Sequence, residues 1–347
     1  MPGRGDGAGK ITGDEPVINR AFVDQVAARG ITVRYNEPLA SHTTFRIGGP
    51  SDAFAVVDEV PALIALVRLA QEYDVPYFLL GGGSNILVSD AGVRGLVIAN
   101  RCQGVRTFED DQGTELIAEA GASLAGTARW AVRAGLDGLT WAVSVPGTVG
   151  GAVVGNAGAY DGCIGDVLES VQVLMSDGSI VEMGVEALEY TYRGSVLKRL
   201  AGEGKLPPVV LCARFCLHRA NMENLKARAA AYLAHRRRTQ PTEPSIGSIF
   251  RNPPNDYAGR LVEAVGLKGY RVGEAGFSPL HANFIVNYGK AQARDVVSLI
   301  DLARRKVFQQ FGIRLEPEIL FVGQWSQWPP YALLSDAMAP TGVRETR

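Results

Sequence analysis

The sequence predicts an α+β fold of more than one domain. The chain has 347 residues, 46% of them apolar and 20% charged, and a chain of this length is expected to form two or three domains. Its first third shows a β-α-β pattern, whereas its middle third mixes hairpin strands with a helix. The apolar fraction is typical of globular proteins, so wholesale disorder is excluded.

The β-α-β pattern begins with a short strand over residues 54–57. Asp58 and Pro61 mark the start of a helix. Its apolar side chains recur at helical spacing, as Leu63, Leu66, Val67 and Ala70. A second strand, residues 77–80, runs directly into three glycines. This arrangement is typical of a β-α-β unit with a glycine loop at its end.

The middle third contains four expected strands and one helix. Ser123 is expected to cap the start of the helix, which Gly135 ends. The dipeptide Asp177-Gly178 between two apolar runs indicates a hairpin. The strands are expected over residues 116–119, 170–175, 180–183 and 209–217.

The last third is expected to hold two helices and a strand. The first helix covers residues 221–239 and shows an apolar stripe. The second has its apolar face over residues 296–311, ends at Gly312, and leads to a strand at 319–322. We therefore expect a disordered tail at 1–17, two subdomains and a further domain at 18–100, 101–220 and 221–323, and a C-terminal tail at 324–347.

Charge and apolar patterning exclude two classes of partner. The 35 basic residues nearly cancel 36 acidic ones, giving a net charge of −1, and no basic stripe is present, so nucleic acid is not expected. The start of the chain lacks the apolar stretch of a secretory signal. The most apolar stretch, residues 141–160, is interrupted by Pro146 and several glycines, so no segment is expected to cross a membrane.

The four cysteines indicate a reducing compartment rather than disulfides or a metal centre. None of Cys102, Cys163, Cys212 and Cys216 forms a C-x-x-C pair. Cys212 and Cys216 fall on one expected strand, roughly 13 Å apart, which is too far for a disulfide or a shared metal ion. We expect a cytoplasmic protein with no metal site.

Two glycine-rich segments are candidate sites for a phosphate-bearing ligand. The first follows the strand at 77–80, where backbone N–H groups can converge on an anion because no Cβ blocks the approach. It matches neither the G-x-G-x-x-G fingerprint nor the G-x-x-x-x-G-K-[ST] loop. The second segment, residues 145–160, offers exposed backbone to an extended ligand, so the pair suggests a dinucleotide. The alternatives are a structural turn and a pair of glycine-rich hairpins.

A third candidate site combines polar residues from three distant segments. Arg193 follows a strand, Ser248 follows a proline-rich turn, and Glu318 precedes the last strand. If these segments converge, the arginine can pair with a substrate carboxylate in a bidentate fork. Read separately, the same residues are more typical of a surface ion pair, a turn hydroxyl and a solvated edge charge. Spacing alone favours the second interpretation.

Seven different sequence blocks are distributed along nearly the whole chain apart from its tails. They cover residues 42–49, 81–88, 145–160, 192–193, 247–253, 281–287 and 315–318. In this order they resemble the UDP-N-acetylenolpyruvoylglucosamine reductase family. Arg251 stands where the family commonly has lysine, and Val154-Gly155 before Asn156 departs from the usual pair, which affects the fine flavin contacts.

The resemblance implies a fold and a reaction. The fold is an FAD-binding module of the vanillyl-alcohol-oxidase type in two subdomains, followed by an α+β substrate-binding domain. The reaction is that of an NADPH-driven UDP-N-acetylmuramate dehydrogenase, which reduces UDP-N-acetylglucosamine enolpyruvate to UDP-N-acetylmuramate in peptidoglycan precursor synthesis. FAD is expected to bind non-covalently, with NADPH as co-substrate. No obligatory protein partner is implied.

The matching blocks also imply roles for individual residues. The family's catalytic arginine falls on Arg193, its proton-donating serine on Ser248 and its glutamate on Glu318. The short sequence distance between Arg193 and Ser248 is similar to that of the shorter subtype. Substrate-side positions fall on Tyr192, Asn252, His281 and Asn283. Flavin-contacting positions fall on Arg46, Gly48, Gly49, Gly81, Gly82, Gly83, Ser84, Asn85, Pro146, Gly147, Gly150, Gly151 and Asn156.

Two other functions fit parts of this pattern. A sugar or alcohol oxidase of the same fold would reoxidise its flavin with oxygen, and such enzymes often tether FAD through His or Cys. His42 is the one histidine beside a flavin-type block. A non-catalytic nucleotide-binding module would keep the glycine segments, but it has no use for Arg193, Ser248 and Glu318 together.

Overall fold

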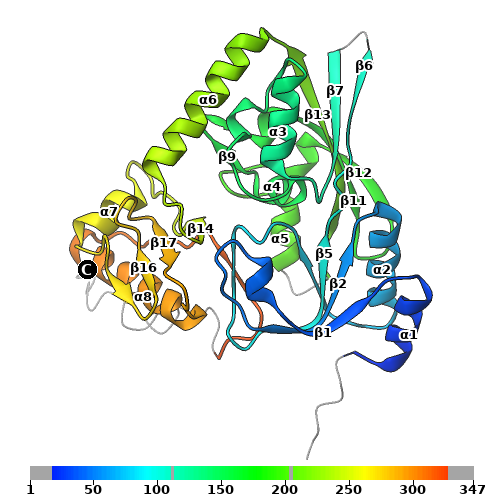
Figure 1. Ribbon diagram of the computed structural model, residues 1–347, viewed down its shortest axis with the longest axis horizontal. Helices are drawn as coiled ribbons and strands as arrows, with labels where there is room; N and C mark the ends of the chain where they lie inside the picture. Colours follow the sequence, from blue (N-terminus) through cyan, green and yellow to red (C-terminus); the bar gives the residue numbers. More distant parts are fainter. Residues whose placement is uncertain (1–17, 111–112, 203–205, 327–347) are drawn as a thin grey trace, which may run out of the picture.

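The structure is a computed structural model that describes residues 18–110, 113–202 and 206–326. Its elements form three packed units (Figure 1). The N-terminal tail expected at residues 1–17, and most of the C-terminal tail expected at 324–347, lie outside the described residues. Among the helices that are described, none is both long and apolar enough to span a bilayer.

The first unit is a four-stranded sheet covered by two helices. Its elements are α1 (Arg20–Ala28), β1 (Val33–Pro38), β2 (Pro50–Val57), α2 (Val60–Glu72), β3 (Tyr77–Leu80) and β5 (Val93–Asn100). The strand order is β1-β2-β5-β3, with β2, β5 and β3 parallel and β1 an antiparallel edge. The buried face of α2 includes all four apolar residues predicted from the sequence, together with Leu69, which confirms that helix.

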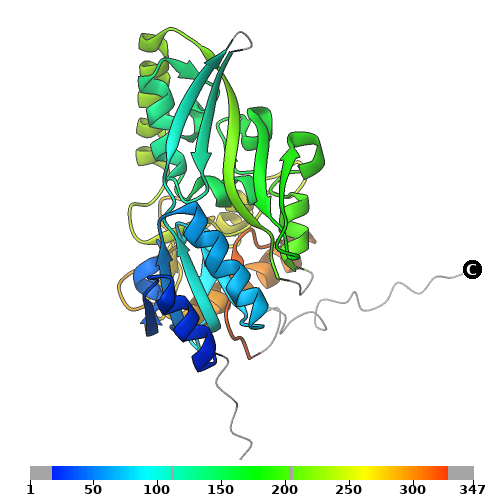
Figure 2. The same ribbon diagram turned by 90° about the vertical axis from the view of Figure 1, so that its right-hand side faces the viewer.

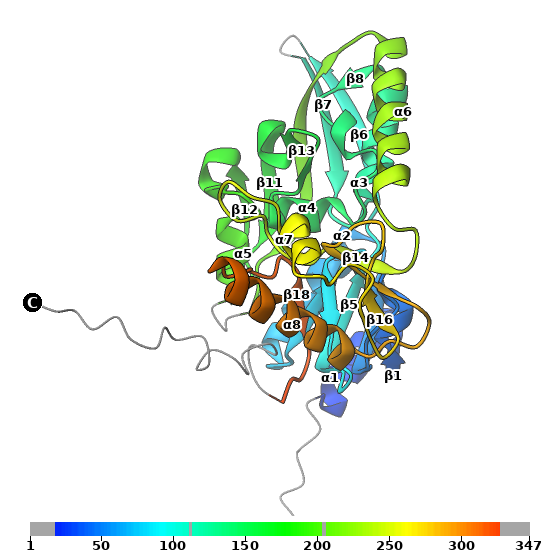
Figure 3. The same ribbon diagram turned by 90° about the vertical axis from the view of Figure 1, so that its left-hand side faces the viewer.

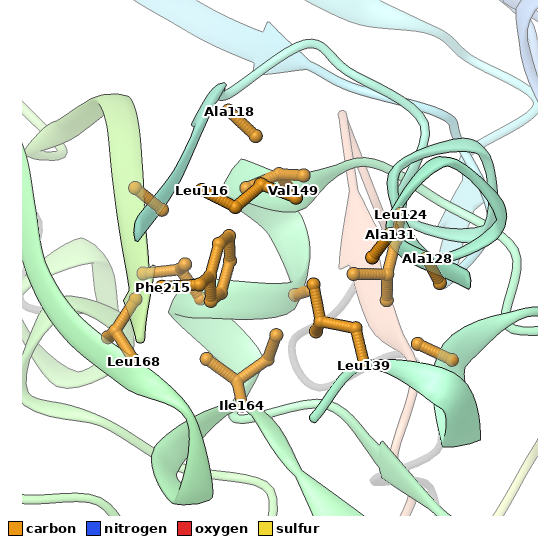
Figure 4. Close-up of a cluster of buried hydrophobic side chains, with 14 of the residues drawn as sticks. Leu116, Ala118, Leu124, Ala128, Ala131, Leu139, Val149, Ile164, Leu168 and Phe215 are labelled. Atoms are coloured by element: carbon orange, nitrogen blue, oxygen red, sulfur yellow. The ribbon is translucent and has the colours of Figure 1, made fainter. Parts of the chain in front are cut away.

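The second unit is an antiparallel sheet with helices on one face. Its strands are β6 (Val105–Asp110), β7 (Gly113–Glu119), β8 (Leu136–Asp137), β11 (Leu168–Leu174), β12 (Ile180–Gly184) and β13 (Val209–Arg219), in the order β12-β11-β13-β7-β6 with β8 beside β13. Its helices include α3 (Leu124–Arg133) and α4 (Val149–Gly155). Figure 4 shows the core between them, in which Phe215 of β13 lies near Leu116 and Ile164.

Two local predictions for this unit are confirmed. Ser123 caps α3, since its Oγ accepts a hydrogen bond from Gly126 N at 3.2 Å, and Gly135 follows the helix with a left-handed φ of +72°. The hairpin around Asp177 and Gly178 is the antiparallel pair of β11 and β12.

The long helix α6 (Met222–Thr239) packs on the second unit. Leu225 and Ala229 are buried in the same hydrophobic cluster as α3 and β13, and Figure 2 shows α6 and α3 on one side of the sheet. The sequence places this helix in an expected domain at 221–323. In the structure its buried residues pack against the preceding unit.

The third unit contains a small antiparallel sheet and two helices. Its elements are β14 (Ser245–Ser248), α7 (Ala258–Ala264), β15 (Arg271–Val272), β16 (Ala275–Phe277), β17 (Phe284–Asn287) and α8 (Ala293–Phe311), with strand order β14-β17-β16-β15. Gly312 ends α8 with a φ of +68°, as predicted. Phe45, Ile47 and Leu87 of the first unit are buried in its core.

The third unit is joined to the first by strand pairing and helix capping. The last strand, β18 (Leu320–Val322), pairs in parallel with β4 (Ile86–Val88), which returns the chain to the first unit (Figure 3). Asp90, just after β4, accepts hydrogen bonds from the first N–H groups of α8, Ala293 N at 2.8 Å and Arg294 N at 3.1 Å. The position of the glycine loop before β4 is therefore fixed by the third unit.

The remaining elements surround the second glycine segment. α4 begins within that segment, where Thr148 caps the helix through Oγ1. β9 (Gly158–Ala159) and β10 (Gly162–Cys163) form a short hairpin after it, and α5 (Val196–Gly202) lies beside α4. The segment expected to be open backbone is thus partly helical, and its hairpin is limited to the end.

Candidate active site

The two glycine-rich segments lie directly against each other. A Cβ built on Gly82 would lie 2.9 Å from Gly147 Cα, and one built on Gly81 would lie 2.5 Å from Thr148 Oγ1. A Cβ on Gly147 would meet Ser84 Oγ at 2.7 Å. Side chains are excluded here because the two segments pack through their backbones. A ligand bound by one segment therefore lies close to the other.

The first segment has unused hydrogen-bond donors. The backbone N–H groups of Gly82, Gly83, Ser84 and Asn85 donate to no other group in the described part of the chain. Its carbonyls, by contrast, are held: Arg101 binds Gly81 O at 3.0 Å and Thr44 N binds Gly83 O at 3.1 Å. Successive free N–H groups on a fixed loop attract phosphate oxygens. The loop fits the pyrophosphate of a dinucleotide such as FAD.

Other glycines at flavin-contacting positions are required by packing within the protein. Gly48 and Gly49 pack against the end of β4, and a Cβ on Gly49 would lie 2.2 Å from Asp90 O. A Cβ on Gly150 would lie 2.8 Å from Ala120 Cβ. Direct flavin contacts of these glycines stay predictions. Three other residues at such positions are exposed and available to a ligand: Arg46, Pro146 and Gly151.

Asn156 holds the turn that carries Arg193. Its Nδ2 donates to Thr191 O at 3.1 Å and its Oδ1 accepts from Gly165 N at 3.1 Å. The residue has a left-handed φ of +44° at the end of α4. The predicted flavin contact of Asn156 stays a prediction, and the structure assigns its amide a bracing role within the protein.

Arg193 forms an ion pair with Glu318. Its Nε lies 2.8 Å from Glu318 Oε1, and its Nη2 donates to Gly158 O at 3.0 Å. Arg193 lies in a tight turn between Thr191 and Gly194, whose backbones exchange two hydrogen bonds, and its φ is +58°. The catalytic interpretation requires these distant segments to converge, and the arginine and the glutamate do so.

Ser248 lies in the segment that pairs with the backbone of Glu318. Glu318 N donates to Ile249 O at 2.7 Å, and Arg251 N donates to Glu316 O at 2.9 Å. The Ser248 side chain is half-buried, and its hydroxyl has no hydrogen-bond partner among the described residues. Figure 1 shows β14, α4 and α5 at the centre of the molecule, where the three units meet.

Asn85 connects the glycine loop to the Glu318 segment. Its backbone O accepts from Leu320 N at 2.9 Å, and its Nδ2 reaches Glu318 O at 3.5 Å. One residue thus holds the glycine loop next to the segment that carries the glutamate.

Three cations face the Glu318 carboxylate. Arg193, Lys198 and Arg251 each act electrostatically on it and favour its charged form. Burial nevertheless raises the pKa of Glu318 above its ordinary value, because lost hydration outweighs the three attractions. Burial, with the neighbouring charge of Arg251, also lowers the pKa of Lys198. Sequence reasoning missed Lys198, because a lysine on a short helix is usually solvated.

The four substrate-side residues have different environments. Tyr192 is 59% exposed beside the Arg193 guanidinium. Asn252 is exposed, and its Oδ1 accepts a hydrogen bond from Ala258 N, at the start of α7, at 3.1 Å. Burial lowers the pKa of His281, whose Nδ1 accepts from Asn283 N at 3.2 Å. Asn283 is buried, and its amide binds both backbone groups of Phe250, N at 3.0 Å and O at 2.9 Å.

His42 is engaged within the protein. Its Nε2 lies 2.7 Å from Glu37 Oε1, and its ring stacks on Phe54 at a centroid distance of 4.3 Å. A covalent tether to FAD through Nε2 would break this contact. The described residues also contain no group of three or more His, Cys, Asp or Glu side chains arranged to hold a metal ion.

Two family models match the chain. An FAD binding domain matches residues 51–184, and the C-terminal domain of UDP-N-acetylenolpyruvoylglucosamine reductase matches residues 240–322. The second match begins at the residue after α6, in agreement with the packing of that helix on the second unit.

Known relatives align over most of the chain. The UDP-N-acetylenolpyruvoylglucosamine reductases of Chloroflexus aggregans and Chloroflexus aurantiacus are each 45% identical, over 83% and 84% of this chain and 97% and 98% of the relatives. The crystal structure of UDP-N-acetylenolpyruvylglucosamine reductase from Thermus caldophilus is 35% identical with a TM-score of 0.68, covering 84% of this chain and 98% of that one. The chain belongs to the UDP-N-acetylenolpyruvoylglucosamine reductase family.

Membership of the UDP-N-acetylenolpyruvoylglucosamine reductase family fixes the class of protein. The chain is a flavoprotein oxidoreductase of peptidoglycan precursor synthesis. The predicted fold class is confirmed, because an FAD-binding module precedes the C-terminal domain of this family in an α+β chain.

Replacing Asn283 is expected to affect stability more than substrate binding. Asn283→Ala leaves the buried N–H and C=O of Phe250 without partners, which costs about 1–3 kcal/mol for such groups. Urea unfolding measures this loss. A variant of unchanged stability whose KM for the substrate rises would instead support the substrate contact that the sequence implies.

Glu318→Gln is expected to remove a pH-dependent loss of stability. Because the pKa of Glu318 is raised in the fold, its contribution to stability is fully present below its ordinary pKa of 4.5 and is lost as pH rises through the higher folded value. The amide cannot ionise, so the variant should lose less stability than the wild type between pH 5 and pH 8. Urea unfolding at both pH values measures the difference, with the exposed Glu316→Gln as matched control. Equal losses in all three proteins would contradict the assignment.

Proposed function

We propose that this enzyme reduces the enolpyruvyl double bond of UDP-N-acetylglucosamine enolpyruvate and forms UDP-N-acetylmuramate, with FAD as cofactor and NADPH as reductant. The observation that carries the proposal is the Arg193–Glu318 ion pair, held at 2.8 Å beside the Ser248 segment and joined to the glycine loop through Asn85. This is an arrangement of charge and proton donors suited to a substrate carboxylate. The curated relatives bear the name of this reductase.

The two glycine-rich segments are the proposed FAD site. The free N–H groups of Gly82, Gly83, Ser84 and Asn85 would hold the pyrophosphate. The exposed start of α4 at Gly151 and the exposed Arg46 would contact the rest of the cofactor. Reduced FAD, when bound, supplies the hydride that reaches the terminal carbon of the enolpyruvyl group.

Arg193 binds the substrate carboxylate in this proposal. A guanidinium has five N–H donors. Arg193 places Nε 2.8 Å from Glu318 Oε1 in an ion pair and donates one hydrogen bond, from Nη2 to Gly158 O. The donors that remain can form a fork with a carboxylate. When hydride adds to the terminal carbon, the electron pair moves onto the neighbouring carbon and its carboxylate. The guanidinium then stabilises an enolate-like dianion more strongly than it stabilises the substrate.

Ser248 and Glu318 act on the negative charge that forms when hydride adds to the substrate. Ser248 donates its hydroxyl proton to the carbon next to the carboxylate, and its hydroxyl has no competing partner in the described chain. Glu318 has a raised pKa and, with a substrate carboxylate beside it, holds a proton and donates a hydrogen bond to the developing negative charge. The products of the step are the lactyl ether and a serine alkoxide, which a proton from solvent restores.

The purified protein is expected to be yellow and to release its flavin on acid precipitation, because His42 is engaged with Glu37 and Phe54. Absorbance of the supernatant measures release, and NADPH should bleach the bound flavin without the substrate. A colourless protein that cannot be reconstituted with FAD would contradict the proposal. If oxygen reoxidises the flavin during turnover as fast as the enolpyruvyl ether does, the oxidase function should be preferred.

Ser248→Ala separates the two half-reactions. Reduction of FAD by NADPH needs no proton on the substrate, so it should proceed near the wild-type rate. Oxidation of the reduced flavin by the enolpyruvyl ether should slow by roughly 10²–10⁴-fold, the range for a lost general acid. Stopped-flow absorbance measures both steps.

Arg193→Ala is the comparison variant for this experiment. It should weaken both substrate binding and the oxidative half-reaction, because its charge meets the carboxylate before and during reaction. An unimpaired oxidative half-reaction in Ser248→Ala would remove Ser248 from the catalytic residues, whatever the result for Arg193→Ala.

A further inference from the structure

Lys198 is bound to the backbone of the proposed carboxylate-binding arginine. Its Nζ donates to Arg193 O at 3.1 Å. Its helix, α5, is fixed at its start by Ser195, whose Oγ donates to Val154 O at 2.7 Å and accepts from Lys198 N at 3.1 Å. The lysine therefore lies on an element anchored to α4, with its ammonium directed at the turn.

The turn that receives this hydrogen bond is strained. Arg193 has a φ of +58°, whereas the glycine next to it, Gly194, does not occupy the left-handed position. A residue other than glycine is disfavoured in that region, because its Cβ lies too close to the following carbonyl oxygen. Asn156 holds the turn before Arg193 through Thr191 O, and Lys198 holds it at Arg193 itself. The two contacts together keep the guanidinium in place against Glu318.

The charge of Lys198 acts at the same point. The charged groups that face Glu318 are Arg193 from the turn, Lys198 from α5 and Arg251 from the segment after β14. Three cations and one carboxylate leave an excess of positive charge before substrate binds. That excess matches the carboxylate of the substrate and the second negative charge of the enolate.

We propose that Lys198 is a positioning residue for the reductive step: its ammonium locks the left-handed backbone of Arg193 and supplies positive charge that the dianion requires. This inference rests on the proposed function, since it assigns Lys198 to the same site. The lysine acts through Arg193 and Glu318, and no contact with the substrate is assigned to it.

Lys198→Met tests the proposal, because methionine keeps the length and packing of the side chain but removes the ammonium. The oxidative half-reaction with the enolpyruvyl ether should slow by roughly 10–10²-fold, the cost of a misplaced catalytic group. Reduction of FAD by NADPH, flavin content and thermal stability should stay close to wild type. Lys198→Arg, which restores a donor and a positive charge, should recover most of the lost rate.

The pH dependence separates positioning from a purely structural role. Removing a cation raises the pKa of Glu318 further, so the high-pH limb of the oxidative half-reaction should move upward in Lys198→Met. A merely structural loss would lower the rate equally at every pH. The matched control is Arg199→Met, which removes the next cation on α5, an exposed partner of Glu189.

The outcomes for the two proposals are distinguishable. A Lys198→Met variant with the rate and pH profile of Arg199→Met would overturn the positioning role. So would a rate loss that Lys198→Arg does not recover or that leaves the high-pH limb unmoved. If the wild-type enzyme itself fails to reduce the enolpyruvyl ether, the proposed function fails instead, before any variant is compared.

Discussion

The burial of the Glu318 carboxylate is the constraint on which the site depends. A carboxylate removed from water is tolerated only where cations and hydrogen bonds replace its hydration. The three cations that do so come from different elements: a turn of the second unit, the helix α5 and the segment after β14. Displacing any one of these elements leaves a buried charge less compensated. The site is therefore complete only when the second and third units are packed together.

The pairing of β18 with β4 fixes the glycine loop relative to the Glu318 carboxylate. β18 pairs with β4, and Asn85, which precedes β4, binds the backbone of both Leu320 and Glu318. A displacement of β4 would move the free N–H groups of the loop and the glutamate together. The relative position of the glycine loop and the Glu318 carboxylate is thus set by backbone pairing.

Local structure can be predicted from the sequence where it depends only on residues within one element or one turn. The apolar stripe of α2, the Ser123 cap of α3 and the Asp177-Gly178 hairpin depend on neighbours along the chain, and each prediction is confirmed. The unit against which α6 packs could not be predicted from the sequence. Its apolar stripe shows that one face of the helix is buried, but not which partner buries it. The sequence indicates that the glycines at 81–82 and 147 permit a close backbone approach. It does not show that the two loops approach each other, because this contact joins segments far apart in the chain.

The site could be predicted in part for the same reason. The sequence blocks that resemble a family predict the roles of Arg193, Ser248 and Glu318, whereas spacing alone favours three unrelated surface residues. Asn156 and Asn283 stand at positions where the resemblance implies ligand contacts, but in the structure the side-chain amides of both form hydrogen bonds with backbone groups of the protein. The proposed role of Lys198 could not be predicted from the sequence. It depends on one hydrogen bond to the backbone of Arg193 and on charges from other elements.

In the proposed site, backbone strain is concentrated at Arg193, the residue that would bind the substrate carboxylate. Glycine would occupy this conformation without cost, but it would remove the guanidinium that pairs with Glu318. The chain instead keeps arginine and offsets the strain with hydrogen bonds from Asn156 to Thr191 O and from Lys198 to Arg193 O. Those two side chains hold the turn on either side of the strained residue. Strain of this kind persists only where surrounding groups enforce it, so the residues that brace the turn belong to the site as much as the arginine does.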